Sequence, residues 1–81
     1  MEHADLTFKA MLGLALPFGL GIAAFGSALA LGRAVSAAME AMGRQPEAAN
    51  KIQLGMIIGC ALIEALTIYA LVAVFFLGGK I

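Results

Sequence analysis

Two long stretches almost free of charge constrain the fold of this chain more than any other feature. Residues 10–32 contain no charged side chain, and residues 52–79 contain a single one, Glu64. A helix rises about 1.5 Å per residue, so about 20 residues cross the hydrocarbon core of a bilayer. Both stretches are therefore long enough to span a membrane as helices.

The alternative to a membrane protein is a soluble bundle that buries both helices. Surface helices of soluble bundles keep a polar face, and neither stretch has one. The chain is 63% hydrophobic and only 12% charged, whereas soluble domains carry about 25% charged residues. We therefore expect membrane lipid to surround both stretches.

Charge and metal-binding residues exclude several classes of function. Five basic residues balance five acidic ones, so we expect no nucleic-acid partner. With one cysteine, Cys60, and one histidine, His3, we expect neither an intrachain disulfide nor a metal site. We interpret Cys60 as a packing residue and His3 as a solvated one.

A short polar segment between the two stretches predicts an antiparallel hairpin. Gly43 is typical of a helix end and Pro46 of the first turn of the next helix. We place helix one at about 8–42, the loop at about 43–47 and helix two at about 48–79, in a single domain, 1–81. Glu40 and Arg44, one turn apart, are expected to form an ion pair. A slight basic excess near the loop favours a cytoplasmic loop, with both termini on the opposite side.

Small residues occupy every second position of one segment of helix one: Gly26, Ala28, Ala30 and Gly32. Because two residues turn a helix by about 200°, positions 26 and 30 form one stripe and 28 and 32 another, nearly opposite. Small residues let membrane helices approach closely, and one partner helix cannot occupy both sides. If the same contact repeats between identical copies, a neighbour occupies each side of the helix, and the repeated contact can close into a ring. Because Gly and Ala are common in membrane helices, this pattern alone favours a ring only weakly.

The carboxyl group of Glu64 is the candidate functional group. An ionised carboxylate at the bilayer centre costs about 3 kcal/mol, and no Lys, Arg or His lies within two turns of it on its own helix. The protonated form is favoured in lipid, and a cation in another subunit would favour release of the proton. These two environments suit a proton carrier. A structural hydrogen-bonded acid is the alternative, but ionisable residues within spans are functional by default.

Residues near Glu64 are expected to complete its site. We expect the hydroxyl of Tyr69 to hydrogen-bond to the protonated carboxyl, although tyrosines also lie at membrane interfaces. Leu62 and Ala65 flank the carboxylate as apolar support.

Three segments resemble the c-subunit family of F-type ATP synthases, and the likeness covers roughly residues 10–79. Residues 44–48 resemble the family's RQP loop, 63–69 its ion-binding stretch, and 26–32 its GxGxGxG motif. The resemblance implies an all-α membrane hairpin that assembles into a homo-oligomeric ring and turns against the stator's a-subunit. It implies a non-catalytic protein whose only cargo is H⁺, in the inner membrane of a bacterium.

The resemblance also assigns roles to residues. Glu64 would take up a proton from one half-channel and release it near the stator arginine. Three loop residues would contact the central stalk: Arg44, Gln45 and Pro46. Sodium-coupled members of the family have a different pattern, with Gln or Glu on helix one and Ser or Thr directly after the carboxylate. At those two positions this chain has Leu31 and Ala65. A dehydrated cation requires several hard oxygen ligands, so we expect proton coupling.

Two other functions remain open from the residues alone. A small drug–proton antiporter also uses a membrane glutamate, but it needs aromatic residues to hold a drug, and this chain is only 7% aromatic, with no Trp. A structural or pore-forming hairpin, such as a holin, has no need of a single central acid.

Overall fold

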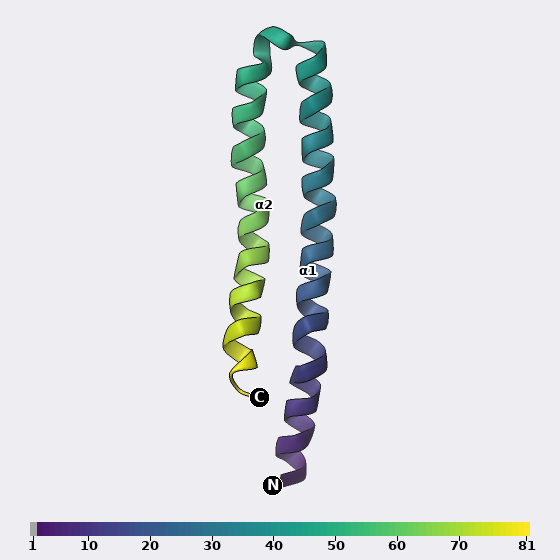
Figure 1. The fold of residues 1–81 in the computed structure, drawn as a ribbon, viewed down its shortest axis with the longest axis vertical. Helices are drawn as coiled ribbons and strands as arrows, with labels where there is room; N and C mark the ends of the chain where they lie inside the picture. The colour runs from purple at the N-terminus through teal and green to yellow at the C-terminus, as the bar shows by residue number, and fades with distance from the viewer. Residues whose placement is uncertain (1) are drawn as a thin grey trace.

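The computed structural model describes residues 2–81 as two long antiparallel helices joined by a tight turn (Figure 1). Helix α1 spans Glu2–Arg44, the single-turn 3₁₀ helix η1 spans Pro46–Ala48, and α2 spans Ala49–Gly78. The Cα trace measures 66 × 16 × 8 Å. The predicted two-helix hairpin is confirmed.

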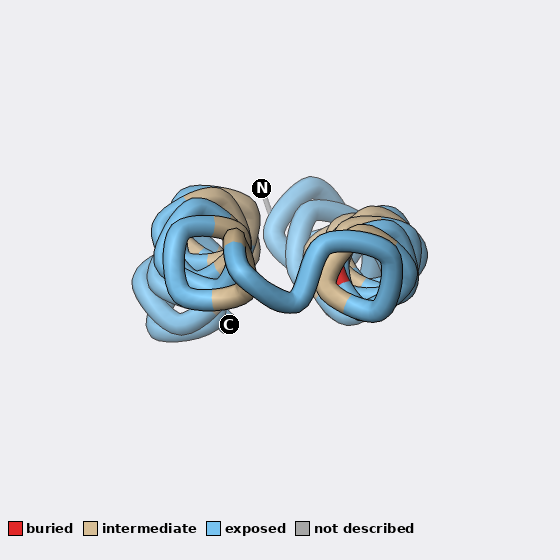
Figure 2. The backbone as a smooth tube through the Cα atoms, turned by 90° about the horizontal axis from the view of Figure 1, so that it is seen from above, coloured by how far each residue is buried: buried red, intermediate tan, exposed pale blue. Residues whose placement is uncertain are grey.

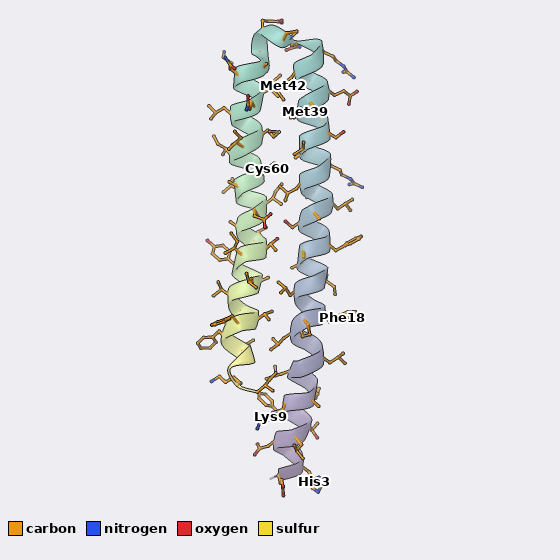
Figure 3. The ribbon with its side chains drawn as sticks, viewed as in Figure 1. His3, Lys9, Phe18, Met39, Met42 and Cys60 are labelled. Atoms are coloured by element: carbon orange, nitrogen blue, oxygen red, sulfur yellow. The ribbon has the colours of Figure 1, made fainter. Side chains whose placement is uncertain are left out.

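Helix α1 is longer at both ends than the sequence predicts. It begins at Glu2 rather than at about residue 8, and it ends at Arg44 rather than at about 42. Acidic side chains in the first turn, Glu2 and Asp5, stabilise the positive end of the helix dipole. The extra turns carry the N-terminal end of α1 past the end of α2 (Figure 1). His3, which is exposed as predicted, and Lys9 both lie on this extension (Figure 3).

The turn between the helices is shorter than the predicted loop at about 43–47. The backbone N–H of Gln45 donates to the carbonyl of Ala41 at 2.9 Å, and the N–H of Ala48 donates to the carbonyl of Gln45 at 3.0 Å. Pro46 occupies the first turn of η1, a position where its missing N–H leaves no bond unmade. Helix α2 then begins at Ala49 and ends at Gly78, within a residue of the predicted 48–79.

The two helices meet along one narrow face, the seam. Partly buried residues recur every three or four positions on both helices, a spacing typical of left-handed coiled-coil packing. Within residues 2–81 only Ala38 is fully buried, and exposed residues cover most of both helices (Figure 2). The central seam consists of Ala23, Ser27, Ala30, Ala34 and Ala38 of α1 and Met56, Gly59, Cys60, Ile63, Thr67 and Ala70 of α2.

Large apolar side chains cover the outside of the hairpin. Phe75 is 85% exposed, Leu14 73% and Leu66 70%. Apolar surface on this scale is not left in water by a soluble protein. Both helices are long and apolar enough to cross a membrane, and their most apolar windows are not buried inside the molecule.

Candidate functional site

Glu64 lies midway along α2, as the sixteenth of its thirty residues. Each end of the helix is therefore about 20 Å away along the axis, so a membrane-spanning α2 holds this carboxylate deep in hydrocarbon. The side chain is exposed on the isolated hairpin. The acid therefore faces the surroundings of the hairpin and not its seam.

Glu64 has no hydrogen-bond or ion-pair partner within residues 2–81. The ion pair found there joins Glu40 Oε1 to Arg44 Nη2 at 2.8 Å, as the sequence predicts. Arg33, the nearest basic residue of α1 to the middle of the membrane, is exposed and forms no ion pair with Glu64. Within the described hairpin, the carboxylate therefore has neither a hydrogen-bond donor nor a cation beside it.

Within the described chain, Tyr69 does not hydrogen-bond to Glu64. Five residues rotate a helix by about 500°, so the two side chains leave α2 about 140° apart. Tyr69 is 69% exposed and Leu62 67%, and Leu62 leaves the helix about 160° from Glu64 by the same rule. Ala65 is half-buried near α1. One hairpin thus brings none of the three supporting residues onto the carboxylate.

The four small residues of helix one lie on two different sides of α1. Ala30 is half-buried, and both Ala30 and Gly26 line an open groove between the two helices. Ala28 and Gly32 are exposed and line a shallow depression on the open side of α1. No heavy atom of the described chain beyond the local helix lies within 4 Å of a Cβ built on Gly32. This open stripe has room for a second helix.

The predicted stalk-contact residues are all accessible. Arg44, Gln45 and Pro46 are exposed at the end of the hairpin where the chain turns (Figure 1). Their position leaves them free to contact another protein outside the membrane.

Two hydroxyl groups at the seam belong to residues that the sequence pattern does not single out. Ser27 Oγ and Thr67 Oγ1 are buried and have no hydrogen-bond partner within residues 2–81. A sequence signal exists, because Ser and Thr are scarce polar side chains in otherwise apolar spans. Which helix face each one occupies, however, depends on the register of the two helices.

Across residues 2–81, no group of three or more His, Cys, Asp or Glu side chains is placed to hold a metal ion. Cys60 is a free, half-buried thiol on the seam, one turn before Glu64 on α2.

Comparison with known proteins identifies the family. Residues 12–77 match the family model that describes the C subunit of ATP synthase. The ATP synthase c-subunit of Protochlamydia amoebophila is 69% identical over 91% of this chain and 76% of its own length. The ATP synthase c-subunit of Syntrophobacter fumaroxidans is 46% identical over 83% of the chain and 74% of its own length. The ATP synthase c-subunit of Desulfosudis oleivorans is 47% identical over 89% of the chain and 75% of its own length. No solved structure matches.

The match extends over both helices and the turn, so it covers the carboxylate, the small-residue stripes and the loop together. It sets aside the antiporter and the pore-forming hairpin. The role of the ATP synthase c-subunit family is proton translocation, as a non-catalytic part of the rotor ring in the membrane. This chain belongs to that family and is an integral membrane protein, a rotor-ring subunit of an F-type ATP synthase.

Proposed function

We propose that Glu64 is the residue that carries the proton, one for each passage of its protomer past the stator. The observation that supports this most directly is a lone carboxylate midway along α2, exposed and without a partner in the described part of its own chain. In lipid the ionised form costs about 3 kcal/mol, so the side chain travels protonated. A cation facing it reverses that preference and releases the proton.

The stator's a-subunit supplies that cation as an arginine in this proposal. Arg33 is not a substitute, because it forms no ion pair with Glu64 within the described hairpin. A fixed Arg33–Glu64 pair would hold the carboxylate ionised through the whole circuit, and no proton would be carried.

Tyr69 supports the protonated carboxyl of the neighbouring copy rather than its own. On a single α2 the two side chains diverge by about 140°, which suits two adjacent copies that face each other from opposite sides. Leu62 and Ala65 then provide the apolar walls between the copies. The open stripe of Ala28 and Gly32 provides the close helix contact that repeats round the ring.

The carried ion is H⁺ and not Na⁺. A dehydrated cation needs several hard oxygen ligands. Where sodium-coupled members of the family have polar side chains, this chain has Leu31 and Ala65, neither of which has a side-chain oxygen.

The turn faces the cytoplasm and contacts the central stalk through Arg44, Gln45 and Pro46. Their exposure at the tip of the hairpin supports this contact. Lys51 and Arg33 add to the basic charge on the loop side, which favours a cytoplasmic loop. Both termini then lie on the opposite side of a bacterial inner membrane.

Carbodiimide labelling of the assembled ring in its membrane tests the ion. The reagent reacts with the protonated carboxyl group, so we expect labelling of Glu64 to fall as the pH rises and to be unaffected by millimolar NaCl. KCl at the same ionic strength is the control. Protection by NaCl but not by KCl would refute proton coupling, and labelling of another acid in place of Glu64 would refute its role as the carrier.

A further inference from the structure

One exposed stripe of α1 changes from apolar to polar within a single turn. Seven exposed residues, each three or four positions after the one before, form this stripe: Phe18, Ile22, Phe25, Leu29, Arg33, Ser36 and Glu40. Because this spacing keeps side chains on one side of a helix, the seven share a face, and none of them belongs to the seam. The change falls between Leu29 and Arg33, as it does where hydrocarbon gives way to lipid headgroups.

The positive charge of Arg33 is not balanced by an acid of the hairpin. The carboxylate nearest to it on the stripe, Glu40, pairs instead with Arg44 at 2.8 Å. Rotation about the axis of the ring keeps all copies of a residue at one depth, so neighbouring copies add further arginines at this level. A fixed pair with Glu64 would hold that carboxylate ionised. The charge of Arg33 therefore requires an anion from outside the protein.

Arg33 and Ser36 present hydrogen-bond donors to the same place. Both line the shallow depression on the open side of α1. Arg33 leaves the helix about 100° from Gly32, so it lies at the edge of the contact with a neighbouring copy and not within it. A guanidinium and a hydroxyl together match the oxygens of a phosphate group. We propose that Arg33 and Ser36 bind the phosphate of a phospholipid whose acyl chains lie along the apolar part of the stripe.

The apolar part of the stripe favours a lipid over a free phosphate ion. Phe25 is 72% exposed and Phe18 67%, and both are on the side of Arg33 that faces away from the turn. Arg33 and Phe18 are about 22 Å apart along the axis, whereas one leaflet provides half of a hydrocarbon core about 30 Å thick. Acyl chains that start at Arg33 therefore meet apolar side chains along their whole length.

The proposed phosphate lies deeper than the charged boundary of α2. Ala30 and Ile63 line the same groove between the helices, so they lie at similar depth, and Arg33 is then level with Cys60. Lys51, the basic residue on the turn side of α2, is nine positions from Cys60, or about 14 Å along the axis. One flat bilayer cannot place its phosphates at both levels. The lipid on this face of α1 is therefore distinct from the lipid around α2.

Solid-state NMR of the assembled ring tests the site without depending on proton transport. The ring is placed in phosphatidylglycerol vesicles in a phosphate-free buffer, and the dephasing of labelled carbons by ³¹P is measured. We expect dephasing at Arg33 Cζ and Ser36 Cβ, and much less at the Cβ of Val35, which has the same depth on another side of α1. No dephasing at Arg33 would overturn the proposal, because the guanidinium would then contact water or a neighbouring copy. Dephasing that requires added phosphate ions would show a free-anion site and would also overturn it.

Substitutions test whether Arg33 holds the phosphate next to Ser36. Arg33→Gln should abolish the dephasing at Ser36 Cβ, whereas Arg33→Lys retains a positive charge and should retain the contact. Lys51→Gln, which removes a charge from an exposed position of α2, should leave the dephasing unchanged. The mass of the detergent-solubilised assembly checks that each variant still forms a ring. Dephasing at Ser36 that survives Arg33→Gln, or that is lost in Arg33→Lys while the ring is intact, would refute the site.

Discussion

The two helices of the hairpin differ in how their surfaces are built. Helix α1 has small residues on two sides of its middle section, such as Ala30 on the side that meets α2 and Gly32 on an exposed side. Helix α2 has one packed face and otherwise bulky exposed side chains such as Leu66 and Phe75. A helix with two slim sides fits between neighbours, whereas a helix with bulky sides fits against lipid. We therefore expect α1 on the inside of the ring and α2, with Glu64, on the outside.

The largest effect is expected from replacing the carboxyl group of Glu64 on α2. Glu64→Gln keeps the size of the side chain but cannot bind and release a proton, so proton-driven ATP synthesis in vesicles should be lost entirely while the ring stays assembled. Glu47→Gln, the same change in the exposed turn, should leave most of the activity. Transport that survives Glu64→Gln would end the assignment of the carrier to α2.

A bulky residue on the open stripe of α1 is expected to prevent ring formation. Gly32→Leu places a large side chain where the proposed neighbour must approach closely, and the mass of the detergent-solubilised assembly should fall from a closed ring to small species. The same type of change on α2, Ala73→Leu, adds to an exposed face and should leave the mass unchanged. If the two variants behave alike, the inside–outside distinction between the helices is wrong.

Overpacking the seam is expected to weaken the assembly without destroying it. Ala38 is the buried residue of the described chain, only 8% exposed, so Ala38→Leu should destabilise the packed helices by about 1–3 kcal/mol. The measurement is the temperature at which the ring dissociates in detergent. Ala10→Leu, at an exposed position of α1 next to Lys9, should not lower it.

The smallest effect is expected at the end of α1. Glu40 and Arg44 form an ion pair with 66% and 75% of their side chains exposed, and exposed pairs of this spacing contribute about 0.3–0.5 kcal/mol. Glu40→Gln should therefore lower the temperature at which the ring dissociates in detergent only slightly, and by even less at high salt. A large loss of stability would show that Glu40 has a partner in a neighbouring copy.

Much of the fold follows from the sequence because membrane insertion depends on local composition. An uncharged stretch of sufficient length predicts a span wherever it lies, and Gly43 and Pro46 mark the turn by their own backbone preferences. The start of α1 is less predictable. Charged residues such as Asp5 and Lys9 indicate an end to the span, and they do end the apolar stretch, but they do not end the helix.

The proposed carrier can be identified from the residues alone, because one acid in the middle of an apolar span is conspicuous whatever surrounds it. The faces that meet cannot be identified in this way, because they depend on the register and rotation of α1 against α2. The packed hairpin buries the hydroxyl groups of Ser27 and Thr67 at the seam, leaves Glu64 exposed, and separates Tyr69 from the carboxylate of its own chain. Hydrophobicity is a property of each residue, whereas a contact is a property of two helices at once.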